Sequence, residues 1–263
     1  MLTAGIDIGS SSTKAVIMDE RVVVASALIP TGAHSSTAAS RVMELVLEKS
    51  KAGMPDIAYI VSTGYGRVNV PFAQKNITEI SCHARGVNWY FPGVRTVLDM
   101  GGQDCKAIKC DGAGRVMKFA LNDKCAAGTG RYLERLSKYT RIPLDEIGPM
   151  SLQTVNGPVS VDSFCAVFAE NDVLLRIREG YQINDILAGA VDAIVERIVT
   201  IIQRIGAEPE LSISGGIAKN TGVVSRVEKR LGMNALISEE PQIIGAVGAA
   251  LFARDMALKS GKR

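Results

Sequence analysis

Hydrophobic residues follow two different periods along the chain, and together these periods predict a mixed α/β protein. Short apolar runs bounded by glycine or polar residues have the length of buried strands, whereas apolar residues repeated every three to four positions indicate amphipathic helices. Strands are expected at residues 3–8, 14–18, 22–29, 56–61, 115–121 and 210–214. Helices are expected at residues 37–50, 79–89, 129–141, 166–178 and 184–205, and another helix is expected to begin near Pro241.

A pattern of strand, small-residue turn and strand occurs twice. In the first copy, Asp7-Ile8-Gly9 precedes Lys14-Ala15-Val16, and the spacing from Asp to Lys is seven residues. In the second copy, Asp99-Met100-Gly101 precedes Lys106-Ala107-Ile108 with the same spacing. Repeated spacing of this kind indicates an internal duplication. We therefore expect two lobes, residues 1–92 and residues 93–263, with a nucleotide-sized cleft between them and a final helix that can return to the first lobe.

Both turns have the composition of a phosphate-binding loop. Residues 10–13 are rich in hydroxyls, and the second turn contains Gly101-Gly102, so each allows backbone N–H groups to approach phosphate oxygens. Asp7 at a strand end would hold Mg²⁺ through water. Gln103-Asp104 would orient the water that attacks a γ-phosphate. An ordinary hairpin turn is the alternative for residues 10–13.

Two later glycine-containing segments suit the remainder of a nucleotide. Residues 214–220, Ser-Gly-Gly-Ile-Ala-Lys-Asn, follow a predicted strand and open a helix, which suits packing against an adenine or ribose. The helix that begins near Pro241 carries a face of small residues. We expect that Gly248 and Ala249 let this helix pack tightly against a sheet. Gly245 is the better candidate for a nucleotide contact.

Two cysteines stand directly before predicted helices. Cys125 begins Cys-Ala-Ala-Gly-Thr-Gly, and Cys165 begins Cys-Ala-Val-Phe-Ala-Glu. A helix N-terminus would stabilise a thiolate or an anionic cluster sulfur there, although close packing is the alternative. Zinc sites and iron–sulfur clusters commonly take four protein ligands, so one chain supplies half a site. A two-fold homodimer would supply the other half.

The other cysteines are expected to be structural. Cys82 lies in a predicted helix and is interpreted as a core residue, whereas the role of the adjacent His83 stays open. Cys105 and Cys110 lie on a predicted strand, where buried structural thiols are common.

Composition and charge narrow the class of protein. Hydrophobic residues make up 47% of the 263 residues, which is enough for one large domain or two fused lobes. The net charge of +3 is spread along the chain, so no nucleic-acid partner is expected. No apolar run reaches the length of a membrane-spanning helix, so no membrane partner is expected. Five cysteines and the lack of a signal peptide predict a cytoplasmic location.

Taken together, the motifs resemble the superfamily of acetate and sugar kinases, actin and heat-shock ATPases, which have duplicated actin-like (ribonuclease H-like) lobes. Within that superfamily, the two cysteine segments, Thr-Gly-Tyr-Gly-Arg at residues 63–67 and Gly-Gly-Gln-Asp at residues 101–104 resemble 2-hydroxyacyl-CoA dehydratase activators and benzoyl-CoA reductase ATPase subunits. The resemblance covers almost the whole chain. Residues 10–13 and Phe164 depart from many activators, and neither difference identifies the partner enzyme.

The resemblance implies an ATPase that works as a homodimer. ATP and Mg²⁺ would lie in each cleft, and Cys125 and Cys165 of both subunits would hold one [4Fe–4S] cluster. The protein would take an electron from reduced ferredoxin or flavodoxin and, on ATP hydrolysis, pass it to an iron–sulfur dehydratase or reductase. The catalytic candidates are Asp7, Asp99, Gln103 and Asp104. The nucleotide-binding candidates are Gly9, Ser10, Ser11, Ser12, Thr13, Lys14, Gly101, Gly102, Gly128, Thr129, Gly130, Gly215, Gly216, Ala218, Lys219, Asn220, Gln242 and Gly245.

Alternative functions stay open from sequence. The partner is expected to be a 2-hydroxyacyl-CoA dehydratase, but the chain could instead be the ATPase subunit of a benzoyl-CoA-reductase-type enzyme or the reductase of another iron–sulfur protein. A small-molecule kinase, with Asp99 or Asp104 as base, would leave Cys125 and Cys165 without a role. A nucleotide-binding regulator with a zinc-bridged dimer is the interpretation outside enzymology.

Overall fold

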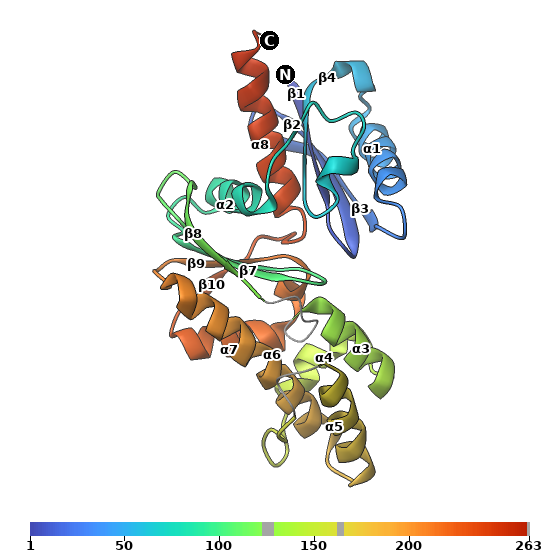
Figure 1. Cartoon of the computed structure of the whole chain (residues 1–263), viewed down its shortest axis with the longest axis vertical. Coiled ribbons are helices and arrows are strands. Elements are labelled where there is room, and N and C mark those ends of the chain that lie inside the picture. Colours follow the sequence, from blue (N-terminus) through green and yellow to red (C-terminus); the bar gives the residue numbers. More distant parts are fainter. Residues whose placement is uncertain (123–128, 162–165, 262–263) are drawn as a thin grey trace. The chain divides into compact units, whose positions relative to one another are not determined.

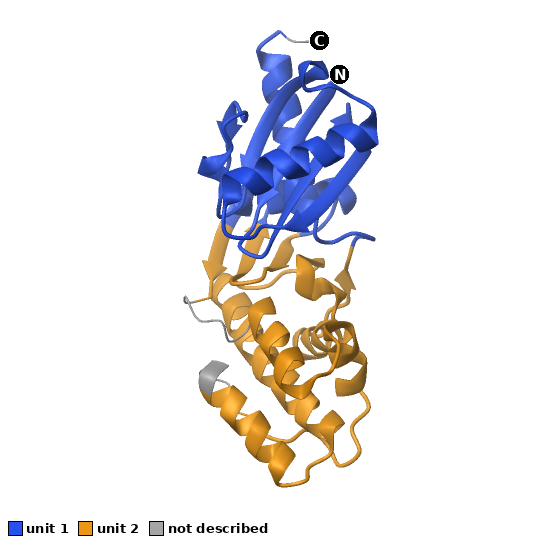
Figure 2. Ribbon diagram, turned by 90° about the vertical axis from the view of Figure 1, so that its right-hand side faces the viewer, with its two compact units in different colours: residues 1–94, 110–117, 238–263 blue, residues 95–109, 118–237 orange. Residues whose placement is uncertain are grey.

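The computed structural model describes residues 1–122, 129–161 and 166–261, and these residues form two compact units (Figure 1, Figure 2). Unit 1 contains residues 1–94, 110–117 and 238–263, and unit 2 contains residues 95–109 and 118–237. The first stretch of unit 1 ends two residues beyond the predicted lobe boundary at residue 92. The last helix, which was expected to be able to return to the first lobe, lies in unit 1 and covers one face of the unit 1 sheet.

Unit 1 is a five-stranded sheet with helices on both faces. Its strand order is β3-β2-β1-β4-β5, with β1 antiparallel to β2 and parallel to β4. Buried residues of β1 such as Ala4 and Ile6 pack with α1, and Val16 and Met18 of β2 pack with α8 on the other face (Figure 1). The elements are β1 (Leu2–Ile8), β2 (Ser12–Asp19), β3 (Val22–Pro30), α1 (Ser35–Ser50), β4 (Ile57–Thr63), β5 (Lys75–Asn76), α2 (Glu79–Tyr90) and α8 (Ile244–Lys259), with 3₁₀ turns at Met54–Asp56 and Arg67–Asn69.

Unit 2 repeats the same sheet topology. Its order, β8-β7-β6-β9-β10, has β6 antiparallel to β7 and parallel to β9, as β1 is to β2 and β4. One hydrophobic core joins this sheet to the helices of the unit. The elements are β6 (Thr96–Met100), β7 (Cys105–Cys110), β8 (Val116–Leu121), α3 (Gly130–Thr140), α4 (Leu144–Ser151), α5 (Ala166–Arg178), α6 (Ile183–Ile205), β9 (Leu211–Ser214), a 3₁₀ turn at Gly216–Lys219, α7 (Thr221–Leu231) and β10 (Ala235–Leu236). The predicted duplication of actin-like lobes is therefore confirmed.

The helix α8 contacts its neighbours more closely than its sequence indicated. A Cβ atom added to Gly5 of β1 would lie 2.0 Å from the carbonyl oxygen of Ala246, so the sheet approaches α8 at its backbone. A Cβ atom added to Gly248 would lie 1.8 Å from the carbonyl oxygen of Cys82 in α2. The prediction that Gly248 packs against a sheet is thus wrong, because at this glycine α8 packs against another helix, α2.

None of the described helices is suited to span a membrane. Even α6, the 23-residue helix, lacks the combination of length and apolar composition that a bilayer crossing requires, and so do the other described helices.

Candidate nucleotide site and cysteine segments

The first phosphate turn, residues 9–13, lies at the end of β1 in unit 1 and is held in place by β2 and by the residue after β3. Asp7 and Lys14 are register partners on β1 and β2, and Lys14 Nζ donates to Asp7 Oδ2 at 3.4 Å. Thr31 Oγ1 donates to the carbonyl oxygen of Gly9 at 2.8 Å, and the Thr31 N–H donates to that of Ser11 at 3.1 Å. Thr31 was missed by sequence reasoning because it is distant in sequence and carries no motif.

The chemistry of this turn fits a phosphate group with Mg²⁺. The Ser11 hydroxyl is buried and has no hydrogen-bond partner within the described part of the chain, so it can serve a bound oxygen. Asp7, near the end of the strand that leads into this turn, supplies a buried carboxylate. Among residues 1–122, 129–161 and 166–261, no group of three or more His, Cys, Asp or Glu side chains could hold a metal ion. Mg²⁺ in phosphate sites keeps several waters and uses one or two carboxylates together with substrate phosphates, and Asp7 supplies one such carboxylate.

The second phosphate turn, residues 101–104, lies at the equivalent place in unit 2. Lys106 is 4% exposed and contacts two of the four catalytic candidates, with its Nζ 3.3 Å from Asp99 Oδ2 and 2.8 Å from Asp104 Oδ1. Gln103 is exposed, and the Asp104 side chain is partly exposed, at 44%. Lys106 therefore joins Asp99 to Asp104, and sequence reasoning did not select it as a site residue.

Asp7 and Asp99 each have a glycine beside them with a positive φ of 86°. In unit 2 this is Gly215, where an added Cβ would lie 2.9 Å from Asp99 Oδ1. In unit 1 it is Gly64, where an added Cβ would lie 2.4 Å from Asp7 Oδ1. Thr63-Gly64 is thus the structural counterpart of Ser214-Gly215, because Asp7 pairs with Thr63 as Asp99 pairs with Ser214 across parallel strands.

The rest of the predicted adenosine motif is divided between surface and core. Gly216 and Lys219 are exposed, whereas Ala218 is buried in the core of unit 2. Asn220 caps α7, since its Oδ1 accepts the backbone N–H of Val223 at 3.0 Å. The side-chain oxygen of Asn220 is therefore already engaged in the fold.

The start of α3 is bonded directly to the second phosphate turn. The Gly130 N–H donates to the carbonyl oxygen of Gly101 at 3.0 Å, and the Arg131 N–H donates to that of Gly102 at 2.8 Å. Before the helix, Asn122 Oδ1 accepts the Cys105 N–H at 2.8 Å. The predicted ligand Cys125 and the candidate Gly128 lie outside the described residues, whereas Thr129 is buried at the N-cap position of α3. The described residues on both sides of Cys125 are thus attached to the 101–105 segment.

An ion pair joins the two helices that follow the cysteine segments. Arg135 of α3 donates to the carboxylate of Glu170 in α5. Hydrogen bonds hold the pKa of Glu170 below its usual range, with the largest effect from Tyr139 and a smaller one from Arg135. Cys165, which precedes α5, lies outside the described residues. Since a helix rises about 1.5 Å per residue, each helix begins only about 6–8 Å along its axis from this pair.

The start of α8 brings the last two candidates into unit 1. Gln242 is partly buried just before the helix, and Gly245 is buried in its first turn. An added Cβ at Gly245 would lie 3.0 Å from Asp7 Oδ2 and 2.8 Å from His83 Nε2. The structure therefore brings Gly245 together with Asp7, as a nucleotide site would need, and adds His83.

The described cysteines are core residues, as predicted. Cys82, Cys105 and Cys110 are each at most 1% exposed, and Cys110 Sγ donates to the carbonyl oxygen of Val94 at 3.4 Å. Burial raises the pKa of Cys82 to about 12 and also raises that of Cys105. A buried thiol with a raised pKa is a poor ligand, so Cys82 and Cys105 do not fit a cluster.

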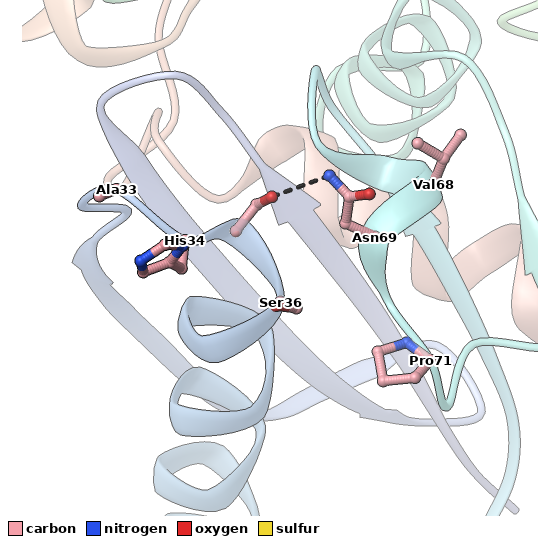
Figure 3. A pocket seen from close by; sticks show the side chains of 7 residues that line it. Ala33, His34, Ser36, Val68, Asn69 and Pro71 are labelled. Carbon is pink, nitrogen blue, oxygen red and sulfur yellow. Dashed lines mark hydrogen bonds between the residues drawn. The ribbon is translucent and has the colours of Figure 1, made fainter.

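A pocket of about 450 Å³ lies at the start of α1 in unit 1 (Figure 3). It is lined by His34, Ser35 and Asn69 among others, and Asn69 Nδ2 donates to Ser35 Oγ at 2.9 Å. None of its lining residues belongs to the predicted nucleotide motifs.

Known proteins resemble the chain along nearly its whole length. The sequence profile of the BadF/BadG/BcrA/BcrD ATPase family matches residues 4–253. A 2-hydroxyisocaproyl-CoA dehydratase activator of Clostridioides difficile is 42% identical over 263 residues, covering 100% of this chain and 98% of the relative. One subunit of the benzoyl-CoA reductase of Thauera aromatica is 30% identical, covering 95% of this chain and 92% of the relative.

Solved structures give the same grouping. The activator of the 2-hydroxyisocaproyl-CoA dehydratase from Clostridium difficile with bound ADPNP superimposes with a TM-score of 0.94 at 41% identity, covering 99% of this chain and 97% of that one. A ROK family glucokinase from Streptomyces griseus has a TM-score of 0.56 at 14% identity, covering 97% and 100%. The second likeness shows only that the fold is shared.

Proposed function

Because the chain belongs to the BadF/BadG/BcrA/BcrD ATPase family, we propose that this ATPase couples ATP hydrolysis to low-potential electron transfer and so activates an iron–sulfur 2-hydroxyacyl-CoA dehydratase. Its electron donor would be reduced ferredoxin or flavodoxin, and it would work in the cytoplasm. The observation that carries the proposal is the pair of hydrogen bonds from Gly130 and Arg131 to the second phosphate turn. They connect a phosphate-sensing turn to the helix that follows Cys125.

Asp7, Lys14 and the turn of residues 9–13 would bind the phosphates and Mg²⁺ in unit 1. Lys14 balances the charge of Asp7, and Thr31 fixes the turn that presents Ser11. In unit 2, Lys106 would orient Asp99 and Asp104, and Gln103, being exposed, would position the attacking water. In the same unit, the glycines at 215 and 216 and the backbone of residues 218–220 would contact the nucleoside.

Cys125 and Cys165 of two copies would hold a [4Fe–4S] cluster, which supplies the one-electron carrier. The chain itself would pass movement from the second phosphate turn to the helices that follow the two cysteine segments. Movement of Gly101 and Gly102 on loss of the γ-phosphate would shift Gly130 and Arg131 and hence the start of α3. The Arg135–Glu170 pair would pass that shift to α5, so both cysteine segments would move together.

The test is anaerobic purification followed by iron and sulfide analysis, with electron paramagnetic resonance spectra recorded with dithionite and with and without ATP. We expect about four iron and four sulfide per dimer, lost in Cys125→Ala and in Cys165→Ala, and a spectrum that responds to nucleotide. A colourless dimer whose ATPase activity survives both substitutions would contradict the proposal. Phosphorylation of a sugar or small acid would then indicate a kinase, and bound zinc without ATPase activity would indicate a regulator.

A permanent reductase component is the second candidate, because a protein of the benzoyl-CoA reductase of Thauera aromatica is a relative over nearly the full chain. Such a component could pair with a related but different ATPase chain instead of a second copy. Purification of the chain alone separates the two cases. A homodimer with a complete cluster favours the activator, whereas a monomer that gains a cluster only with another chain favours the reductase component.

A further inference from the structure

A buried histidine lies beside Asp7. His83, on α2, is 5% exposed, and Asp7, at the end of β1, is also 5% exposed. His83 Nε2 lies 2.8 Å, and Asp7 Oδ2 3.0 Å, from the point that a Cβ atom of Gly245 would occupy. The imidazole nitrogen and the carboxylate oxygen are therefore neighbours around one small space that only glycine leaves open.

Close backbone packing fixes His83 in this place. An added Cβ at Gly86 of α2 would lie 2.2 Å from the carbonyl oxygen of Ile244. The corresponding distance from Gly248 to the carbonyl oxygen of Cys82 is 1.8 Å, and that from Gly5 to the carbonyl oxygen of Ala246 is 2.0 Å. The helix α8 is thus in backbone contact with both α2, which carries His83, and β1, which carries Asp7. The imidazole has little freedom to move away from the carboxylate.

The charge of Asp7 is balanced without the histidine. Lys14 Nζ lies 3.4 Å from Asp7 Oδ2, and the positive end of the α8 dipole begins at Ile244. A lysine on a flexible stem supplies charge but fixes direction poorly. An imidazole has a rigid ring with an N–H in a defined direction, so it can fix the orientation of the carboxylate.

We propose that His83 is a positioning residue for Asp7. It holds the carboxylate in the orientation from which water molecules on Asp7 bind the Mg²⁺ of the nucleotide. The inference rests on the proposed function, since it needs a Mg²⁺–nucleotide complex at the first phosphate turn. Residues that orient a metal-binding group commonly change metal affinity about 10- to 100-fold when they are replaced.

The experiment compares His83→Leu, which removes both ring nitrogens, with His83→Gln, which keeps an N–H donor. Mn²⁺ binding to the ADP complex is titrated by electron paramagnetic resonance, and kcat and the KM for ATP are measured separately. We expect His83→Leu to weaken Mn²⁺ binding about tenfold or more and to lower kcat, while ADP binding in EDTA stays unchanged. His83→Gln should restore most of the Mn²⁺ affinity.

Val87→Ala is the matched control, because Val87 is fully buried on the same helix one turn further on. It should lower stability and leave Mn²⁺ affinity unchanged. The proposal is wrong if His83→Leu binds Mn²⁺ like the wild type, or if Val87→Ala weakens binding equally. His83→Ala replaces His83→Leu in the same comparison if the latter does not fold. A wild-type protein that hydrolyses ATP without any divalent cation would instead overturn the proposed Mg²⁺ site itself.

Discussion

Asp99 and Lys106 form the more deeply buried of two equivalent ion pairs. Their side chains are 6% and 5% exposed, compared with 7% and 12% for Asp7 and Lys14. A buried charge that loses its partner is strongly destabilising, because neither water nor a counter-ion compensates it. The two lysines are therefore expected to differ in their contribution to folding although they share one motif.

We expect Lys106→Met to lower the free energy of unfolding by about 3 kcal/mol or more, because Asp99 loses a buried partner. Lys14→Met should cost less, since its pair is less buried and longer. Urea denaturation followed by circular dichroism measures both. Equal losses for the two variants would show that the depth of burial does not set the cost.

Cys82 gives a pH dependence whose sign follows from its burial. Its pKa is raised from 9.0 to about 12, so between these values the folded chain keeps a proton that the unfolded chain releases. The stability that the protonated Cys82 thiol contributes is fully present below pH 9. As the pH rises above 9, the free energy of unfolding falls by up to about 1.4 kcal/mol per pH unit. We expect Cys82→Ala to show a shallower loss of stability from pH 9 to 11 in urea denaturation. Parallel curves for variant and wild type would contradict this.

At the scale of elements, glycines decide how closely α8 approaches α2 and β1. A side chain at Gly5, Gly86 or Gly248 would meet a carbonyl oxygen at 2.2 Å or less, so the backbone itself would have to move. The pattern of hydrophobic residues does not predict this close approach, because a glycine on a helix face is neither a hydrophobic nor a polar side chain. The close contacts of α8 with α2 and β1 therefore form where glycine has no side chain.

We expect Gly248→Ala to lower the free energy of unfolding by about 1–3 kcal/mol, because the methyl group forces α8 away from Cys82 in α2. Fluorescence of Trp89, the one tryptophan of the sequence and a residue of α2, reports the change. Gly53→Ala is the control, since its nearest neighbours would lie at 3.3 and 3.4 Å. A similar effect of both substitutions would rule out the packing explanation.

At the scale of the molecule, the duplicated sheets are completed by different parts of the chain. Unit 2 has its helices within residues 118–237, whereas unit 1 takes α8 from the C-terminus. Val16 and Met18 of the unit 1 sheet are buried by α8 residues such as Ala246 and Val247. The stability of the first unit therefore depends on α8, which follows the residues of unit 2 in the chain.

We expect truncation after residue 237 to unfold unit 1 and leave unit 2 protected, because only unit 1 loses a helix from its core. Limited proteolysis with mass spectrometry measures this, and a chain that ends at Lys259 is the control. Survival of residues 1–94 as a protected fragment in the truncated chain would contradict the expectation.

Much of the candidate site could be predicted because its signals are local. Asp7, Lys14, Asp99 and Lys106 occur at fixed spacing on paired strands, and the turns after Asp7 and Asp99 have the predicted positions. The helix α4 was not predicted, since Gly148 and Pro149 interrupt its helical pattern. Thr31 and His83 were not assigned, because their contacts with the first turn come from other elements.

The sequence by itself determined most of the elements and their duplication, because periodicity and spacing act over a few residues and set backbone conformation locally. Tertiary structure alone decided that α8 joins unit 1, that Gly248 faces α2, and that His83 lies beside Asp7. These contacts join residues far apart in the chain. Their cause is the fit of complementary surfaces, which no short window of sequence contains.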